Sequence, residues 1–245
     1  MSIHFCCSAK TIQRKLDKVS ISKRNDFSGT SVVIMDTTYF GRGFGVMVFK
    51  NSFDGIVLYK QYVRYETNAL YLAGISEIVR RGISVQGIVC DGRQGLFGLF
   101  GDIPVQMCQF HQIKIVLRYL TRKPKSQAAI ELKRLTLKLT KQTKEKFSNS
   151  LNDWILRWSD YLNERSKSSK TGKTYYTHKR LRSAYLSLKR HLPYLFVCQD
   201  HKELMIPNTT NSLDGQFSDL KNKLRNHNGL SKERKMKFID GFFQA

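Results

Sequence analysis

Two aspartates each follow an apolar run, at positions suited to binding a cation. Asp36 ends the run VVIMD and Asp91 ends the run GIVCD. Ligand and catalytic groups tend to lie at the carboxyl ends of strands in open α/β sheets. If the two strands are neighbours, the carboxylates come close enough to repel each other, and a divalent cation relieves that repulsion. Oxygen ligands suit Mg²⁺ or Mn²⁺. The alternative is that each Asp only starts a turn, where this residue type is common.

A third acid, Asp214, would complete a site for two such ions. It stands near the start of an expected helix at 212–225, within the segment NTTNSLDG. Four apolar residues would form the core face of that helix: Leu213, Phe217, Leu220 and Leu224. Asp214 lies one step around, in line with Lys221 and Arg225, and an acid followed by basic residues suits metal and phosphate together. The alternative is that Asp214 only stabilises the helix N-terminus.

Cys108 and His111 form a Cys-x-x-His pair. A zinc site needs about four ligands, and the sequence has no second pair with suitable spacing. We therefore predict that Cys108 and His111 pack and hydrogen-bond near the active site. The five cysteines are scattered and odd in number, which predicts no disulfide framework and favours a reducing cytosol. They are Cys6, Cys7, Cys90, Cys108 and Cys198.

The elements that must position these residues follow from the apolar pattern. Continuous or alternating apolar runs predict strands at 31–35, 44–49, 56–63, 85–90 and 104–109. A helix is expected at 67–81, with Leu72, Ile75, Ile78 and Val79 on its core face, and a short helical piece is expected after Asp91. A hairpin followed by alternating helices and strands predicts an α/β fold with a mixed sheet.

The charge of the chain is strongly positive. It has 42 Lys and Arg against 19 Asp and Glu, a formal charge of +23. Such a balance indicates a nucleic-acid partner, the alternative being a ribosome-associated or merely basic protein. Residues 114–190 hold 21 basic and 5 acidic residues in a helical pattern, in which Trp154 and Trp158 have the spacing of packing residues. We expect one helix to contain residues 130–139 and a flexible basic loop at 166–174.

Membrane insertion is not expected. No apolar run approaches the ~18 residues of a membrane span, and the N-terminus lacks the layout of a signal peptide.

Four segments in a fixed order give the chain a family resemblance. They are VVIMDTTYFGRGFGVMVF at 32–49, GIVCDGRQGL at 87–96, CQFHQ at 108–112 and NTTNSLDGQFSDLKNKLRNHNGL at 208–230. On these residues the chain resembles Mutator-type transposases, which include bacterial insertion-sequence enzymes and plant Mutator-like elements.

The resemblance implies a ribonuclease-H-like core with a helical insertion between the fifth strand and the last catalytic helix. It implies a DNA transposase that cleaves insertion-sequence ends and transfers strands. Asp36, Asp91 and Asp214 would hold two Mg²⁺ (or Mn²⁺) ions, with Asp36 bridging them, and Cys108 and His111 would match the motif that supports the site. Five basic residues are expected to contact double-stranded DNA, at transposon ends and target: Arg93, Lys114, Arg118, Lys221 and Arg225. The protein would be a homodimer or larger in the active complex, cytoplasmic and associated with a bacterial nucleoid.

The implied domain organisation has four parts. Residues 1–28 would be the remnant of a helix-turn-helix plus linker, 29–122 the first part of the core, 123–205 the basic insertion and 206–245 the last core helices. The chain would then start at the last helix of a DNA-binding module, at 8–18, as in a truncated reading frame.

One further departure is that the third acid of this family is usually Glu, whereas Asp214 is one methylene shorter. Two alternatives remain open: another ribonuclease-H-like nuclease, such as a resolvase or RNA–DNA hybrid nuclease, and an inactive truncated transposase that only binds DNA.

Overall fold

The structure is a computed structural model that describes residues 8–18, 29–227 and 229–244. Cys6, Cys7 and the predicted linker at 19–28 lie outside the described residues. The chain divides into two compact units, one of residues 28–214 and one of residues 1–27 with 215–245. The domain boundaries expected from the sequence stay predictions.

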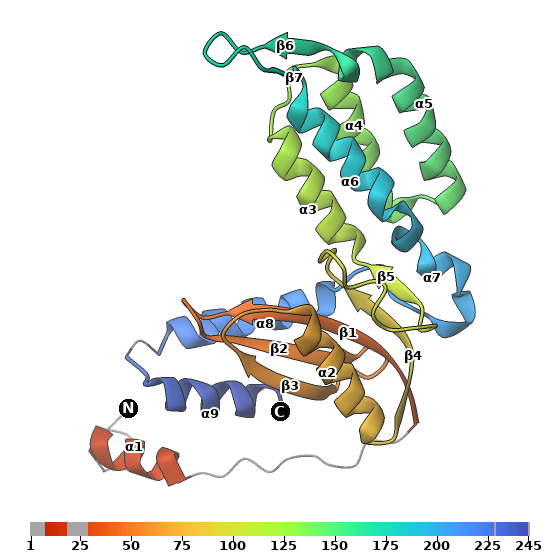
Figure 1. The fold of residues 1–245 in the computed structure, drawn as a ribbon. Coiled ribbons are helices and arrows are strands. Elements are labelled where there is room, and N and C mark those ends of the chain that lie inside the picture. The colour runs from red at the N-terminus through yellow and green to blue at the C-terminus, as the bar shows by residue number, and fades with distance from the viewer. Residues whose placement is uncertain (1–7, 19–28, 228, 245) are drawn as a thin grey trace. The chain divides into compact units, whose positions relative to one another are not determined.

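A mixed five-stranded sheet forms the base of the larger unit (Figure 1). Its strands are β1 (Gly29–Tyr39), β2 (Gly45–Asn51), β3 (Val57–Val63), β4 (Ile83–Cys90) and β5 (Val105–Met107). The spatial order is β3-β2-β1-β4-β5; β1 to β3 are antiparallel, and β4 and β5 run parallel to β1. This is the arrangement of a ribonuclease-H-like core, and the predicted fold class is confirmed.

Helix α2 (Asn68–Arg80) packs on β3 and β4. It begins where the Thr67 hydroxyl accepts a hydrogen bond from the Leu70 N–H, an N-cap that satisfies one free backbone donor. The predicted core face was wrong at two positions, because Leu72 and Val79 are 39% and 51% exposed. The buried face is one step around, and its residues are Tyr71, Gly74, Ile75 and Ile78.

The short helical piece expected after Asp91 is not formed. The structure describes residues 91–104, which connect β4 to β5, as turns and bends. Glycine recurs here at every third position, at Gly92, Gly95, Gly98 and Gly101. Gly95 and Gly101 have positive φ angles of 77° and 60°, a conformation that favours glycine and interrupts a right-handed helix.

A bundle of helices, referred to as the helical layer, extends away from the β5 side of the sheet and contains the predicted insertion (Figure 1). It consists of α3 (Gln109–Leu120), α4 (Gln127–Leu137), η1 (Leu139–Lys141), α5 (Lys144–Asn163) and α6 (Lys179–Leu195). These elements share one apolar core. Trp154 and Trp158 pack there as predicted, and their indole N–H groups donate to the Ala128 carbonyl and the Glu131 carboxylate at 3.0 and 2.9 Å. Leu139 lies in η1, after α4 has ended, and not in the same helix as residues 130–137.

A short hairpin replaces the loop expected at 166–174. Its strands are β6 (Arg165–Lys167) and β7 (Thr174–Tyr176). Thr174, Tyr175 and Tyr176 belong to types that favour strands, and Gly172 supplies a positive φ of 64° in the turn.

Two short elements connect α6 to α8 (Asn211–Arg225). They are α7 (Val197–Asp200) and η2 (Lys202–Leu204), and α8 then begins in the larger unit and continues in the smaller one.

The smaller unit also contains α1 (Ala9–Lys18) and α9 (Lys232–Phe242). The Arg234 guanidinium makes two hydrogen bonds to the Asp17 carboxylate, at 2.8 and 2.9 Å, and joins α9 to α1. Within the ranges that the structure covers, no helix combines the length and apolar character needed to cross a bilayer.

Candidate active site

The register of β1 on β4 brings Asp36 and Asp91 level with each other. These strands are parallel neighbours, and Ile34 pairs with Val89. Asp36 follows two residues after Ile34 within β1, and Asp91 comes directly after β4 ends at Cys90. Neighbouring strands are about 4.8 Å apart, so the two aspartates lie at the same end of these paired strands.

Asp214 joins Asp36 from the first turn of α8. One ligand atom each of Asp36, His111 and Asp214 lie within 4.8 Å of one another, a spacing that could hold a metal ion. The Asp214 N–H donates to the Thr210 carbonyl at 3.0 Å, which fixes the first turn. Among the residues that the structure describes, Asp91 does not belong to this group of three. It is half-buried, and one of its carboxylate oxygens accepts the Arg93 N–H at 3.1 Å.

Burial and neighbouring charges shift the pKa values of both Asp36 and His111 in this group. Burial, with the charges of Asp91 and Asp214, raises the pKa of the Asp36 carboxyl to about 7, against the lowering effects of His111 and the Thr37 N–H. The hydrogen bond with Cys108, together with the charges of Cys108, Asp36 and Asp214, raises the pKa of His111 to about 9, against the lowering effect of burial. A positive charge is therefore favoured between these carboxylates.

Cys108 links the sheet to the segment before α8, and Thr210 is its partner. Its sulfur accepts hydrogen bonds from the Thr210 N–H and hydroxyl at 3.3 and 3.4 Å. The same hydroxyl lies 3.4 Å from His111 Nδ1 and 3.4 Å from an Asp214 oxygen. Burial raises the pKa of the Cys108 thiol, but the hydrogen bonds with His111 and Thr210 outweigh it, and the net shift is downward.

Thr210 is fully buried at the centre of these contacts. The sequence indicated it only as part of the segment NTTN, without a role. Its partner Cys108 is 102 residues away in the chain, and no local pattern connects the two.

The glutamines of the CQFHQ segment also have structural roles that sequence reasoning missed. The Gln109 side chain donates to the Leu195 carbonyl at 2.7 Å and accepts from the Asn208 amide at 3.1 Å. The Gln112 carbonyl oxygen lies 2.7 Å from His191 Nδ1 on α6. The start of α3 is thereby fixed on one side to the segment before α8 and on the other to α6.

The five basic residues expected to contact DNA differ in their surroundings. The Arg93 guanidinium donates to the Asn68 side chain and the Glu66 carbonyl at 2.7 and 2.9 Å, which holds the loop after Asp91 against the start of α2. The other four are exposed: Lys114 and Arg118 on α3, and Lys221 and Arg225 on the part of α8 that belongs to the smaller unit.

The donor set fits a hard divalent cation. Two carboxylates and an imidazole can each supply one ligand atom, and carboxylates are the ligands that Mg²⁺ and Mn²⁺ favour. The buried Asp36 carboxyl has a raised pKa, as expected of a carboxylate whose charge a cation would stabilise. His111 would have to lose its proton before it could act as a ligand.

Comparisons with known proteins find no matching family model and no matching curated protein. Among solved structures, the chain is similar to a Drosophila P element transposase strand transfer complex. The identity is 15%, the match covers 89% of this chain and 74% of that chain, and the TM-score is 0.33.

Proposed function

We propose that this protein is a DNA transposase of the Mutator type, in which Asp36, Asp91 and Asp214 hold two divalent ions for phosphodiester cleavage and strand transfer. One observation carries the proposal: the ligand atoms of Asp36, His111 and Asp214 gather within 4.8 Å. The order of the sequence motifs and the net charge of +23 support DNA as the substrate.

Bound Mg²⁺ or Mn²⁺ would supply activation of the attacking hydroxyl and stabilisation of the leaving oxygen. In hydrolysis a water oxygen attacks phosphorus and the P–O bond to the leaving 3′-oxygen breaks, leaving a free 3′-OH. In transfer that 3′-OH attacks the phosphorus of a target phosphodiester, and the P–O bond to the target's own 3′-oxygen breaks, so the strands are joined and a target 3′-OH is released. No serine or tyrosine nucleophile is needed, since neither step passes through a covalent enzyme–DNA bond.

The chain's own residues prepare the site for this chemistry. The Thr37 N–H donates to Asp36 at 2.7 Å and orients its carboxylate. Thr210 and Cys108 hold the segment before α8, and with it Asp214, against the start of α3. His111 contributes positive charge near the carboxylates while it is protonated, which would limit their repulsion of a DNA phosphate.

The direct test is Asp36→Asn, which removes the charge and keeps the size. We expect wild-type protein to nick duplex DNA with Mg²⁺ or Mn²⁺ and to join a 3′-OH oligonucleotide to a plasmid. Asp36→Asn should lose both activities and keep or improve DNA binding, because a charge that repels phosphate is removed from the site. The matched control is Asp102→Asn, the same change on an exposed loop, which should leave cleavage intact.

Equal cleavage by wild type and Asp36→Asn would exclude the two-metal mechanism. Cleavage without strand transfer would favour another ribonuclease-H-like nuclease. DNA binding with no cleavage by the wild type would favour a protein that only binds DNA.

A further inference from the structure

A basic cavity opens at the end of α3 that is farther from the candidate active site. Its volume is ≈ 510 Å³, and it lies between the end of α3, the segment leading to α4 and the start of α6. Leu120, Pro124 and Leu181 form part of its floor and walls. All of it belongs to the larger unit.

The charged Lys and Arg side chains that line this cavity all have the same sign. Lys123, Lys125, Lys179 and Arg180 line it, and none of its described lining residues is acidic. All four are exposed to solvent. Four cations around one hollow repel one another, so this arrangement is suited to an anionic occupant.

Two of these cations are held in place by contacts that leave their charge uncompensated. The Lys179 ammonium lies 4.4 Å from the centre of the Tyr175 ring, and the Arg180 guanidinium donates to the Arg118 carbonyl at 2.7 Å. Neither partner is a carboxylate. Such positioning lowers the entropy lost when an anion binds.

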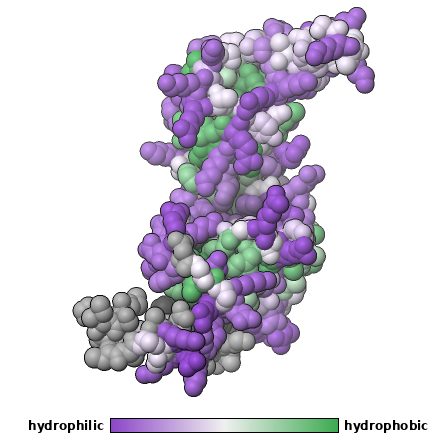
Figure 2. Space-filling model, turned by 90° about the vertical axis from the view of Figure 1, so that its left-hand side faces the viewer, coloured by the Kyte–Doolittle hydropathy of each residue, from purple (hydrophilic) through white to green (hydrophobic). Residues whose placement is uncertain are grey.

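The hairpin β6–β7 continues the positive charge beyond the cavity. Between residues 165 and 182 the sequence has seven basic residues and no acidic one. Lys167, Lys170 and Lys173 are exposed on this hairpin, at the far end of the helical layer from the sheet (Figure 1). Figure 2 shows mainly hydrophilic side chains over that end of the layer.

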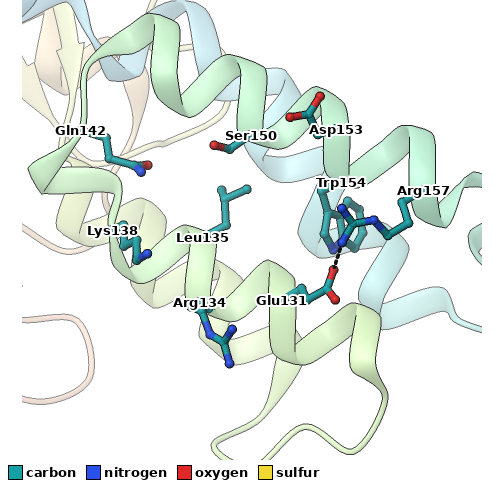
Figure 3. A pocket seen from close by; sticks show the side chains of 9 residues that line it. All are labelled: Glu131, Arg134, Leu135, Lys138, Gln142, Ser150, Asp153, Trp154 and Arg157. Atoms are coloured by element: carbon teal, nitrogen blue, oxygen red, sulfur yellow. Dashed lines mark hydrogen bonds and ion pairs between the residues drawn. The ribbon is translucent and has the colours of Figure 1, made fainter.

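A second cavity in the helical layer provides a contrast (Figure 3). It lies between α4 and α5, has a volume of ≈ 380 Å³, and combines Glu131 and Asp153 with basic residues. Arg157 pairs with Glu131 at 3.2 Å. The carboxylates in this cavity would repel a phosphate. Although the helical layer is basic as a whole, this cavity is therefore not suited to bind an anion.

We propose that the basic cavity and the β6–β7 hairpin form a binding site for the sugar–phosphate backbone of duplex DNA. The ligand class is the phosphodiester, since each phosphate offers a full charge and strong acceptor oxygens. The choice of DNA as the source rests on the proposed function. The site is separate from the carboxylates that would perform the chemistry.

The test uses the full chain and the double variant Lys123→Gln/Lys125→Gln. Both side chains are exposed, so the fold should tolerate the change. Binding to a labelled duplex of mixed sequence is measured in EDTA over a series of salt concentrations. We expect the affinity to fall about tenfold and the slope of log K against log salt to decrease in magnitude by about 2, one unit for each lost phosphate contact.

Two controls make the result specific. Lys146→Gln/Lys189→Gln removes the same charge from exposed positions outside the cavity and should change the affinity by less than about twofold. Lys123→Arg/Lys125→Arg keeps both positive charges, and with them the phosphate contacts, and should bind at least as tightly as the wild type. Unchanged affinity and slope in the glutamine variant would overturn the proposal, and so would an equal loss in the Lys146/Lys189 control.

Because EDTA removes divalent ions, this binding does not depend on cleavage. A binding loss confined to the cavity variant supports the site even if the wild type never cleaves DNA, in which case only the proposed function fails. Cleavage by the wild type with undiminished binding by the cavity variant overturns only the site.

Discussion

The carboxyl group of Asp36 should give the metal-free protein a characteristic pH dependence. Its pKa is about 7 in the folded chain against 3.8 as the ordinary value. The folded state therefore keeps a proton that the unfolded state has released, and stability from this group is full below about pH 4 and is lost as the pH rises to about 7. His111, raised to about 9, acts in the same direction at higher pH.

Thermal unfolding in EDTA measures this effect. We expect the wild-type Tm to fall from pH 5 to pH 8. Over the same interval the Tm of Asp36→Asn should rise relative to that of the wild type. Adding Mn²⁺ at pH 8 should raise the wild-type Tm and should raise that of Asp36→Asn much less. Parallel pH profiles for the two proteins would show that Asp36 is not a buried carboxyl with a raised pKa.

At the third acid, Asp214→Glu restores the longer side chain that the family resemblance leads us to expect. Asp214 is half-buried, and an oxygen of its carboxylate lies 3.4 Å from the Thr210 hydroxyl. The added methylene lengthens the reach of a carboxylate that already belongs to the group with Asp36 and His111. We expect metal-dependent nicking to be kept or increased, and Asp214→Asn to lose it. A loss of nicking in both variants with an unchanged Tm would mean that the site requires the shorter acid.

Among the elements, the contact between α2 and the sheet depends on the missing side chain of Gly74. A Cβ there would lie 2.0 Å from the ring of Phe49, which is fully buried. We expect Gly74→Ala to lower the free energy of unfolding by about 1–3 kcal/mol, because overpacking forces the ring or the helix to shift. Gly98→Ala is the control, since a Cβ there meets nothing within 4 Å. Urea unfolding of both variants measures the difference; equal stability would mean that α2 adjusts without cost.

How much the sequence predicts also differs between elements. The strands that position Asp36 and Asp91 are apolar runs, and burial on both faces leaves a pattern that local reasoning can detect. On α2 the same reasoning placed Leu72 and Val79 on the core face, where the structure buries Tyr71 instead. The Tyr71 hydroxyl donates to the Glu66 carboxylate and lies 3.0 Å from the Thr37 hydroxyl on β1, and local periodicity shows neither contact. The role of Thr210 could not be predicted for a similar reason: its contacts exist only after distant segments have come together.

For the whole molecule, the formal charge of +23 makes a general prediction about binding. Wild-type affinity for duplex DNA should fall steeply with salt, because each phosphate contact releases counterions. Fluorescence anisotropy over a salt series gives the slope of log K against log salt. We expect a magnitude well above 2, the amount attributed above to Lys123 and Lys125 alone. A nearly flat plot would count against DNA as the partner.

Helix α3 has His111 in its first turn and Leu120, a wall of the basic cavity, at its end. His111 and Leu120 are nine residue steps apart, and at about 1.5 Å each these span ~13.5 Å, which equals roughly four steps of B-form DNA at about 3.4 Å per base pair. The helix would therefore act as a ruler: a duplex that lies along α3 and is held in the cavity would present to the carboxylates a bond about four base pairs away. The distance along the DNA between the cleaved bond and the place where the duplex is bound would then be set by the length of one helix and would not depend on the base sequence.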